Sequence, residues 1–171
     1  MKTNQIVQIE TNIGIILVEI YYKKAPITAS NFLRYVDESQ YNGTSFFRTV
    51  NMGNQPNDKV KIEVIQGGQI PKEKEYESIK LERTKDTGLK HVDGTISMGR
   101  IEIDSAKSSF FLCIGDQPEL DYGGKRNPDG QGFAAFGKII KGFEVVRKIQ
   151  GSTHDGQKLI PPIEIIKITR V

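Results

Sequence analysis

Few residue types in this chain occur at spacings that support metal or nucleophilic chemistry. The 171 residues include one cysteine, Cys113, and two histidines, His91 and His154. A single cysteine excludes an internal disulfide and a cysteine-rich metal site. Two widely separated histidines do not give the ligand spacing of a zinc site. We therefore expect no metal centre and no cofactor.

Motifs for covalent catalysis and nucleotide binding are either missing or lack the flanking elements that they require. Serine catalysis needs a Gly-x-Ser-x-Gly turn, which is lacking, and Ser108 and Ser109 lie in an apolar, strand-like run. Residues 130–135 (Gly-Gln-Gly-Phe-Ala-Ala) match the dinucleotide pattern formally. That motif must join a strand to a helix, whereas here a Pro-Asp turn precedes it and a strand-like run follows. Residues 127–130 lack the later carboxylates of a calcium loop.

The most reactive side chains are each interpreted as structural. His91 precedes a turn at residues 92–94, which favours a histidine bonded to nearby backbone. His154 lies in Ser-Thr-His-Asp-Gly, and we expect it in an exposed loop. Cys113 alternates with apolar neighbours in a strand-like run, which predicts a buried, inert thiol.

Composition excludes several classes of protein. Hydrophobic residues make up 37% and charged residues 26%, an ordinary globular balance. Lys plus Arg exceed Asp plus Glu by 24 to 21, too small and scattered an excess to favour a nucleic-acid partner. No apolar run approaches the ~18 residues of a membrane span. With no leader pattern and no sign of an interface, we expect a cytoplasmic monomer; export would require a leader that has been removed.

The elements that must position any site are mainly strands. Two β-branched runs at residues 5–10 and 14–21 flank a turn and predict a hairpin. Further strand-like runs occupy residues 45–50, 61–66, 94–99, 108–114, 134–140 and 163–169. Pro161-Pro162 stand just before the last run, where a missing donor costs little.

Two helices interrupt the strands. Pro26 heads a stretch with apolar residues at helical spacing, which predicts a helix from about residue 27 to 38. A shorter helix is expected at residues 143–149. Loops are expected at residues 51–61, 72–89 (with a short strand inside) and 115–132.

The order of these elements predicts the fold class. Strands and helices do not alternate, so a parallel sheet is a poor interpretation. An antiparallel barrel fits better, because closure removes exposed sheet edges. We predict one domain, residues 1–171, folded as a mainly β, closed eight-stranded antiparallel barrel capped by two α-helices.

Seven segments resemble motifs of the cyclophilin family of peptidyl-prolyl cis–trans isomerases. They are residues 26–32 (Pro-x-Thr-x-x-Asn-Phe), 41–48 (Tyr-Asn-Gly-Thr-Ser-Phe-Phe-Arg), 65–68 (Ile-Gln-Gly-Gly), 94–100 (Gly-Thr-Ile-Ser-Met-Gly-Arg), 108–112 (Ser-Ser-Phe-Phe-Leu), 120–123 (Leu-Asp-Tyr-Gly) and 136–142 (Phe-Gly-Lys-Ile-Ile-Lys-Gly). Each is weak alone, but they follow the family order and cover nearly the whole chain. The family fold, an eight-stranded barrel with two capping helices, agrees with the fold predicted above.

The resemblance implies isomerisation of X–Pro bonds in polypeptides, which assists protein folding. Rotation about such a bond meets a barrier of about 18–20 kcal/mol from C–N double-bond character. A catalyst needs no nucleophile, base, metal or cofactor, but it must favour the twisted amide over both planar forms. The twisted prolyl nitrogen gains a basic lone pair, so a fixed cationic donor beside an apolar pocket lowers the barrier.

Carried over by position, the resemblance implies three catalytic residues. Arg48 is the central donor, Gln66 hydrogen-bonds the substrate backbone and orients Arg48, and Phe111 floors the proline pocket. Phe110 and Phe111 are adjacent on a strand and so face opposite sides, which leaves one for the core. The implied substrate-binding residues are the walls Val64, Leu120 and Phe133, the bordering Phe47, and Gly99, Arg100 and Ser109 of the neighbouring groove.

Departures from the family pattern fall around the implied site. Phe47 stands where the family usually has His, Val64 completes a Glu-Val pair in place of Phe-Met, Ser109 replaces Gln, and Phe133 replaces His or Tyr. The lost apolar area is expected to weaken substrate binding by ~1 kcal/mol.

Two segments also differ in length or character. An insertion at residues 51–61 is expected to reshape one rim of the groove. The long loop at residues 116–131 resembles bacterial members more than animal ones. Glu119 stands where drug-sensitive members carry Trp, which predicts poor binding of cyclosporin.

Two alternatives stay open at this point. The first is a catalytically weak or inactive cyclophilin-like module that binds Pro-containing segments, as the altered pocket would allow. The second is a barrel that binds nucleic acid, which requires aromatic and basic residues interleaved on one face. The basic residues of this chain lie mostly in loops and beside acids, which disfavours the second alternative.

Overall fold

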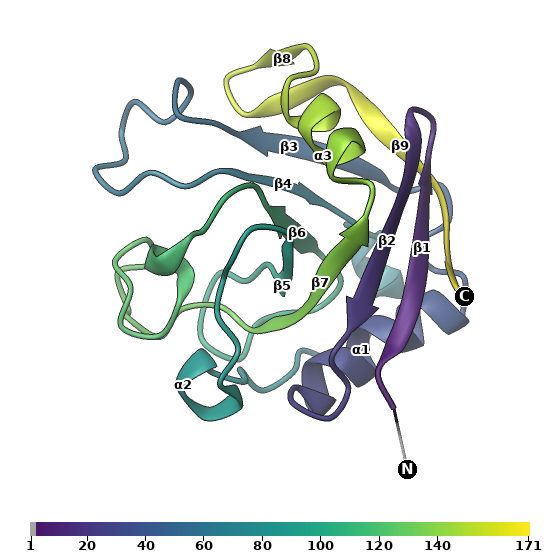
Figure 1. The fold of residues 1–171 in the computed structure, drawn as a ribbon, viewed down its shortest axis with the longest axis horizontal. Helices are drawn as coiled ribbons and strands as arrows, with labels where there is room; N and C mark the ends of the chain where they lie inside the picture. The colour runs from purple at the N-terminus through teal and green to yellow at the C-terminus, as the bar shows by residue number, and fades with distance from the viewer. Residues whose placement is uncertain (1–2) are drawn as a thin grey trace.

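Residues 3–171 are described by a computed structural model of the chain, in which eight antiparallel strands close into a barrel (Figure 1). Neighbouring strands follow the order β1-β2-β7-β5-β6-β4-β3-β9, and pairing of β1 with β9 closes the ring. The strands are β1 (Gln5–Thr11), β2 (Gly14–Ile20), β3 (Ser45–Val50), β4 (Val64–Gly67), β5 (Thr95–Met98), β6 (Phe110–Cys113), β7 (Ala135–Lys141) and β9 (Lys158–Arg170). The two-residue β8 (His154–Asp155) extends β9 as a hairpin. The predicted barrel is confirmed.

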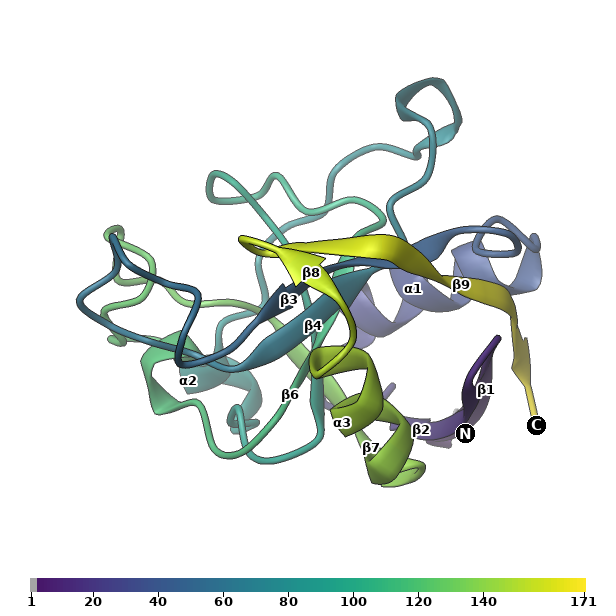
Figure 2. The same ribbon diagram turned by 90° about the horizontal axis from the view of Figure 1, so that it is seen from above.

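Two helices cap the barrel, as predicted, and they lie on opposite sides of it (Figure 2). α1 (Pro26–Asp37) carries Pro26 in its first turn, where the missing N–H costs no hydrogen bond, and buries Phe32. α3 (Phe143–Gln150) buries Val146. Within residues 3–171, no helix combines the length and apolar character needed to cross a membrane.

The segment expected as a loop with a short strand at residues 72–89 contains two helical turns instead. These are the 3₁₀ turn η1 (Lys72–Lys74) and the short helix α2 (Thr84–Thr87). A single bridge between Ile79 and Ala106 takes the place of the expected strand. Because this single bridge is the segment's isolated pairing with another part of the chain, local turns determine the conformation of the residues around it.

Strand alternation divides the apolar residues between the barrel interior and its outer face. Phe110 points inward, where its ring contacts Phe32, Tyr41 and Phe46 at centroid distances of 5.5, 5.4 and 5.9 Å. Phe111 points outward. It joins a second apolar cluster made of Val50, Ile62, Val64, Phe111, Cys113 and Leu120, with Phe133 packed against it.

The strand expected at residues 61–66 begins only at Val64 in β4. The reason lies in the insertion at residues 51–61, whose Gln55 side chain stands in for a partner strand. The Gln55 carboxamide accepts from the Ile62 N–H (3.0 Å) and donates to the Ile62 carbonyl oxygen (2.8 Å). A buried side-chain amide thus satisfies backbone that the expected ladder would have paired.

The last strand, β9, starts earlier than expected and contains Pro161 and Pro162 rather than following them. In its pairing with β3, Phe46 opposes Ile163 and Arg48 opposes Lys158. Between these two pairs, β3 advances by two residues and β9 by five, so the hydrogen-bond ladder is interrupted in β9. Pro161 and Pro162 lie in this interrupted stretch. A residue without an N–H is tolerated at such an irregularity.

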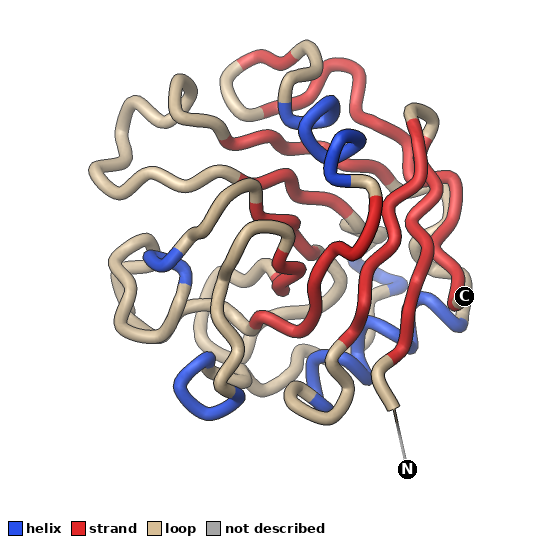
Figure 3. The backbone as a smooth tube through the Cα atoms, in the orientation of Figure 1, coloured by secondary structure: helices blue, strands red, loops and turns tan. Residues whose placement is uncertain are grey.

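The long loops after β3 and β6 lie on the side of the barrel away from β1 and β2 (Figure 3). They comprise residues 51–63 and 114–134, and the second contains the 3₁₀ turn η2 (Pro118–Leu120). Both flank the outer face that carries Phe111.

Phe110 and Phe111 give a matched test of this division. Phe110→Ala should lower the free energy of unfolding by about 3–5 kcal/mol, because it empties the centre of the interior aromatic cluster. Phe111→Ala should cost less, because its ring lies in the smaller outer cluster near the surface. Denaturant unfolding of both variants measures the difference; equal costs would contradict the assignment of the two faces.

Candidate active site

A row of side chains crosses three neighbouring strands on the outer face of the barrel. Arg48 of β3 stands opposite Gln66 of β4, which stands opposite Phe111 of β6. Residues directly opposite in antiparallel strands project from the same face and lie side by side. The pairing register therefore brings together the three residues that the sequence predicted as catalytic.

Two neutral amides hold the Arg48 guanidinium in place. Its Nη1 donates to the Gln66 Oε1 (3.0 Å), and its Nε donates to the Gln157 Oε1 (2.9 Å). The other end of the Gln66 carboxamide donates from Nε2 to the Ser109 Oγ (2.8 Å). Arg48 is thus oriented without being neutralised.

Within the described part of the chain, the positive charge of Arg48 is not neutralised by a carboxylate. Among residues 3–171, no carboxylate lies within ion-pair distance of its guanidinium. Burial, with the nearby Arg126 guanidinium, lowers the pKa of Arg48, while Asp58 opposes the shift. An arginine remains protonated at neutral pH even so, and Arg48 stands as a fixed cation.

This row opens into a hollow of about 210 Å³, here called the groove. The predicted residues that line it are Arg48, Val64, Gln66, Gly99, Arg100, Phe111, Leu120 and Phe133. Phe47 and Ser109 line a neighbouring hollow of about 620 Å³ instead, which shares Gln66, Gly99 and Arg100 with the groove. Their predicted contact with substrate would therefore take place in that second hollow.

The floor of the groove is a clamped aromatic ring. Phe133 meets the Phe111 ring edge-on, with centroids 5.5 Å apart and planes at 89°. His91 stacks against the same ring at 6.0 Å with an interplanar angle of 13°. Ring contacts of these two kinds restrict the rotation of Phe111 and give the groove a flat apolar base.

The partners of His91 differ from the expected backbone ones. Its Nδ1 lies 2.7 Å from the Asp121 Oδ1 and its Nε2 lies 2.9 Å from the Ser97 Oγ. The sequence could not identify these side chains, because Asp121 comes from a distant loop. Ser97 is 0% exposed, so this Ser–His–Asp chain supports the floor of the groove and cannot reach a substrate.

The other two reactive residues lie away from the groove lining. Cys113 is buried beside Phe111, as predicted, and burial raises the pKa of its thiol well above the usual value, which supports the expected low reactivity. His154 is exposed, as expected, although it lies in β8 rather than in a loop.

Arg100 holds a loop rather than presenting a free charge. Its Nη1 and Nη2 donate to the two carboxylate oxygens of Asp129 at 2.8 and 2.9 Å. Its Nε and Nη2 also donate to the Gly132 carbonyl oxygen at 2.9 and 2.7 Å. The hydrogen bonds from Arg100 lower the pKa of the Asp129 carboxyl. Arg100 therefore forms a wall of the groove.

Four residues that line the groove were not predicted from the sequence: Ile62, Arg126, Asn127 and Pro128. Ile62 carried a usable signal, because residues two apart in an extended segment share a face and Val64 was already implied as a wall. Arg126, Asn127 and Pro128 lie in a loop without periodicity, which gives no such signal. Gln157 escaped for the same reason.

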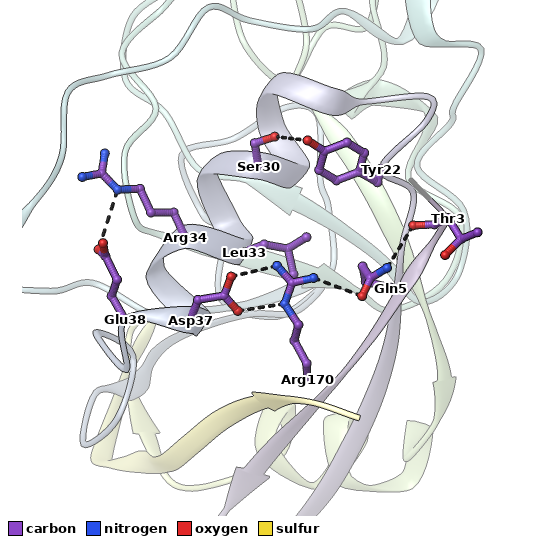
Figure 4. Close-up of a pocket in the computed structure, with 9 residues that line it drawn as sticks. All are labelled: Thr3, Gln5, Tyr22, Ser30, Leu33, Arg34, Asp37, Glu38 and Arg170. Carbon is purple, nitrogen blue, oxygen red and sulfur yellow. Dashed lines mark hydrogen bonds and ion pairs between the residues drawn. The ribbon is translucent and has the colours of Figure 1, made fainter. Parts of the chain in front are cut away.

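A larger hollow elsewhere, of about 560 Å³, lies between α1, β1 and the end of β9 (Figure 4). There Arg170 donates from Nε and Nη2 to the two Asp37 carboxylate oxygens, both at 2.8 Å. Its Nη1 donates to the Gln5 Oε1 at 3.0 Å. This cation is paired with a carboxylate, unlike Arg48, so we assign the site to the smaller groove.

Comparison with known proteins identifies the family. The family described as cyclophilin type peptidyl-prolyl cis-trans isomerase/CLD matches residues 6–170. A peptidyl-prolyl cis-trans isomerase of Acinetobacter baylyi is 35% identical over 173 residues, spanning 96% of this chain and 85% of that protein. Peptidyl-prolyl cis-trans isomerase B of Escherichia coli is 32% identical over 148 residues, spanning 85% and 84%. The chain therefore belongs to the cyclophilin-type peptidyl-prolyl cis–trans isomerases, which confirms the predicted family and enzyme class.

Solved structures agree on the fold. A crystal structure of a cyclophilin-type isomerase from Cryptosporidium parvum matches with a TM-score of 0.80 at 24% identity, covering 99% of this chain and 98% of that chain. A second crystal structure of that protein, determined in the presence of the dipeptide Ala-Pro, matches with a TM-score of 0.79 at 25% identity, covering 98% and 99%.

Gly99 tests how tightly the Gln66 amide is held. A Cβ added at Gly99 would lie 3.0 Å from the Gln66 Nε2, so Gly99→Ala should displace the carboxamide and loosen Arg48. We expect isomerase activity to fall about threefold to tenfold, the equivalent of up to one net hydrogen bond. The control is Gly53→Ala, whose Cβ would meet the Asn51 Oδ1 at 3.4 Å. Equal activity of both variants, with an unmoved Gln66 side-chain amide signal in NMR spectra, would contradict the argument.

Proposed function

We propose that the groove catalyses cis–trans isomerisation of X–Pro bonds in polypeptide segments. The proline ring would rest on Phe111, with Val64, Leu120 and Phe133 around it. Arg48 would face the prolyl nitrogen from the adjacent strand. The observation that carries the proposal is the guanidinium of Arg48, held by Gln66 and Gln157 at the edge of this apolar base.

The chemistry follows from how the amide changes as it twists. Loss of conjugation localises a lone pair on the prolyl nitrogen, whereas in both planar forms that pair is delocalised into the carbonyl group. A donor fixed at that position therefore binds the twisted state more tightly than the substrate or the product, and this difference accelerates rotation. No covalent bond forms or breaks, so the groove requires position and charge alone.

Magnitudes show how far Arg48 can account for catalysis. A charge-assisted hydrogen bond contributes roughly 1.5–3 kcal/mol, and each 1.36 kcal/mol removed from the barrier gives about tenfold in rate. Arg48 would thus supply ~10- to 100-fold. Holding the proline ring and the flanking backbone in one orientation would supply the rest.

Gln66 would act at two places in this scheme. Its oxygen accepts from Arg48 and one N–H donates to Ser109. A carboxamide has a second N–H, which can donate to a substrate carbonyl oxygen. Gln66 would therefore couple the position of the substrate backbone to the position of the guanidinium.

Proline-containing segments are supported as ligands by a related protein. The Cryptosporidium parvum isomerase that shares this fold was crystallised in the presence of Ala-Pro. The walls of the groove in this chain are also apolar at Val64, Leu120 and Phe133, as a proline ring requires.

Replacing Arg48 tests the central role directly. Arg48→Ala should lower kcat/KM for an X–Pro peptide ~10- to 100-fold in a protease-coupled assay, because the twisted nitrogen loses its donor. Arg147→Ala, which removes an exposed arginine from α3, should leave activity unchanged. Undiminished activity of Arg48→Ala would contradict the proposal. Absence of turnover in the parent protein, with measurable peptide binding, would instead favour the non-catalytic peptide-binding module.

A second variant neutralises the charge of Arg48 while keeping an acceptor for its guanidinium, and it also removes the Gln66 N–H that would donate to the substrate. Gln66→Glu preserves side-chain length and still offers Arg48 an acceptor, but it pairs the guanidinium with a carboxylate. We expect kcat to fall about tenfold, while the free energy of unfolding is unchanged or higher. Gln8→Glu in β1 carries the same change of net charge away from the groove and serves as the control. Full activity of Gln66→Glu would show that an open cation is not required.

A further inference from the structure

The insertion at residues 51–61 builds an outer wall for the groove. Gln55, which is 1% exposed, connects this segment internally through hydrogen bonds to the Asn51 carbonyl oxygen (2.6 Å) and to both backbone groups of Ile62. Ile62 in turn lines the groove. The wall is therefore fixed by buried hydrogen bonds.

Arg126 joins this wall to the loop on the other side. Its Nη1 donates to the Gln55 Oε1 (2.8 Å) and to the Val60 carbonyl oxygen (2.7 Å), contacts that span 71 and 66 residues of sequence. Its Nη2 lies 3.5 Å from the Asp58 Oδ2, and the Arg126 side chain is only 11% exposed. The same side chain lines the groove, so a second arginine held by hydrogen bonds borders the substrate space.

The charges around the groove do not cancel. Three arginines line it, whereas none of the lining side chains is a carboxylate. Arg100 is neutralised by close contact with Asp129, but Arg126 meets Asp58 at a longer distance, and that carboxylate is 42% exposed. Arg48 has amide partners. The groove therefore carries net positive charge in a partly desolvated space, where charge acts more strongly than in water.

We propose that Arg126 is a specificity-determining residue, through which the groove favours X–Pro segments that carry an acidic side chain immediately before or immediately after the proline. This inference rests on the proposed function. The groove is small, so a proline ring fills its base and the neighbouring side chain reaches the rim where Arg126 lies. An acidic side chain there is attracted by Arg126, and a basic one is repelled.

The two groove cations carry like charges and repel each other. Burial and, after it, the charge of Arg126 lower the pKa of Arg48, as expected for like charges in a partly buried space. An acidic side chain bound between them would relieve that repulsion.

Peptide pairs test the preference. Two X–Pro peptide pairs differ by Glu or Gln, one immediately before the proline and one immediately after it. In at least one pair the parent protein should show a kcat/KM about fivefold higher for the Glu peptide at low salt. The ratio should fall at 0.5 M salt (Debye length ~4 Å) but stay above one, because a partly buried charge is screened less completely than an exposed one.

Substitutions of Arg126 and its neighbours test whether the preference for an acidic side chain depends on Arg126. Arg126→Gln should bring the Glu/Gln ratio close to one, whereas Lys125→Gln, the same charge change on an exposed neighbour, should retain it. Arg126→Lys should keep most of the ratio, which separates charge from the structural hydrogen bonds. Asp58→Asn should raise the ratio, because it removes the partial neutralisation of Arg126.

The outcomes separate this inference from the proposed function. Turnover of both peptides with a ratio near one in the parent protein would overturn the inference and leave the isomerase proposal intact. So would a ratio that is unchanged in Arg126→Gln. If the parent protein lacks turnover, NMR titration with the same peptides still measures the preference in binding; equal affinities, or no binding, would overturn the inference.

Discussion

The site depends on one pairing register, which sets Arg48, Gln66 and Phe111 opposite one another across β3, β4 and β6. A slip of one residue in either pairing would turn a member of the row into the barrel interior. Phe110 opposes such a slip, because its ring is locked in the interior aromatic cluster. The hydrophobic core of the barrel therefore maintains the geometry of the groove outside it.

Neutral hydrogen-bond acceptors leave the positive charge of Arg48 available to a substrate. Gln66 and Gln157 orient the Arg48 guanidinium with hydrogen bonds, yet neither carries a charge that would neutralise it. A carboxylate in either place would bind the arginine more tightly and leave less of its charge for a substrate. The arrangement suits a reaction in which no covalent bond changes, because an oriented and unpaired cation is able to distinguish a twisted amide from a planar one.

Strand alternation made much of the fold and the inner part of the site predictable, since it places Phe110 and Phe111 on opposite faces. The resemblance to a known family supplied the roles of Arg48 and Gln66. The outer wall was not predictable, because its contacts join distant loops: Gln157 meets Arg48 across 109 residues of sequence. The strand expected at residues 61–66 failed for a related reason, since a side chain of the insertion replaced its partner strand.

A crystal structure of the protein with an X–Pro peptide bound would test the account most directly. We expect the proline ring on Phe111 and the Arg48 guanidinium facing the prolyl nitrogen, placed so that a hydrogen bond forms as the amide twists. A peptide bound in the hollow beside α1, or in the groove with its proline away from Phe111 and Arg48 turned from the amide, would contradict it.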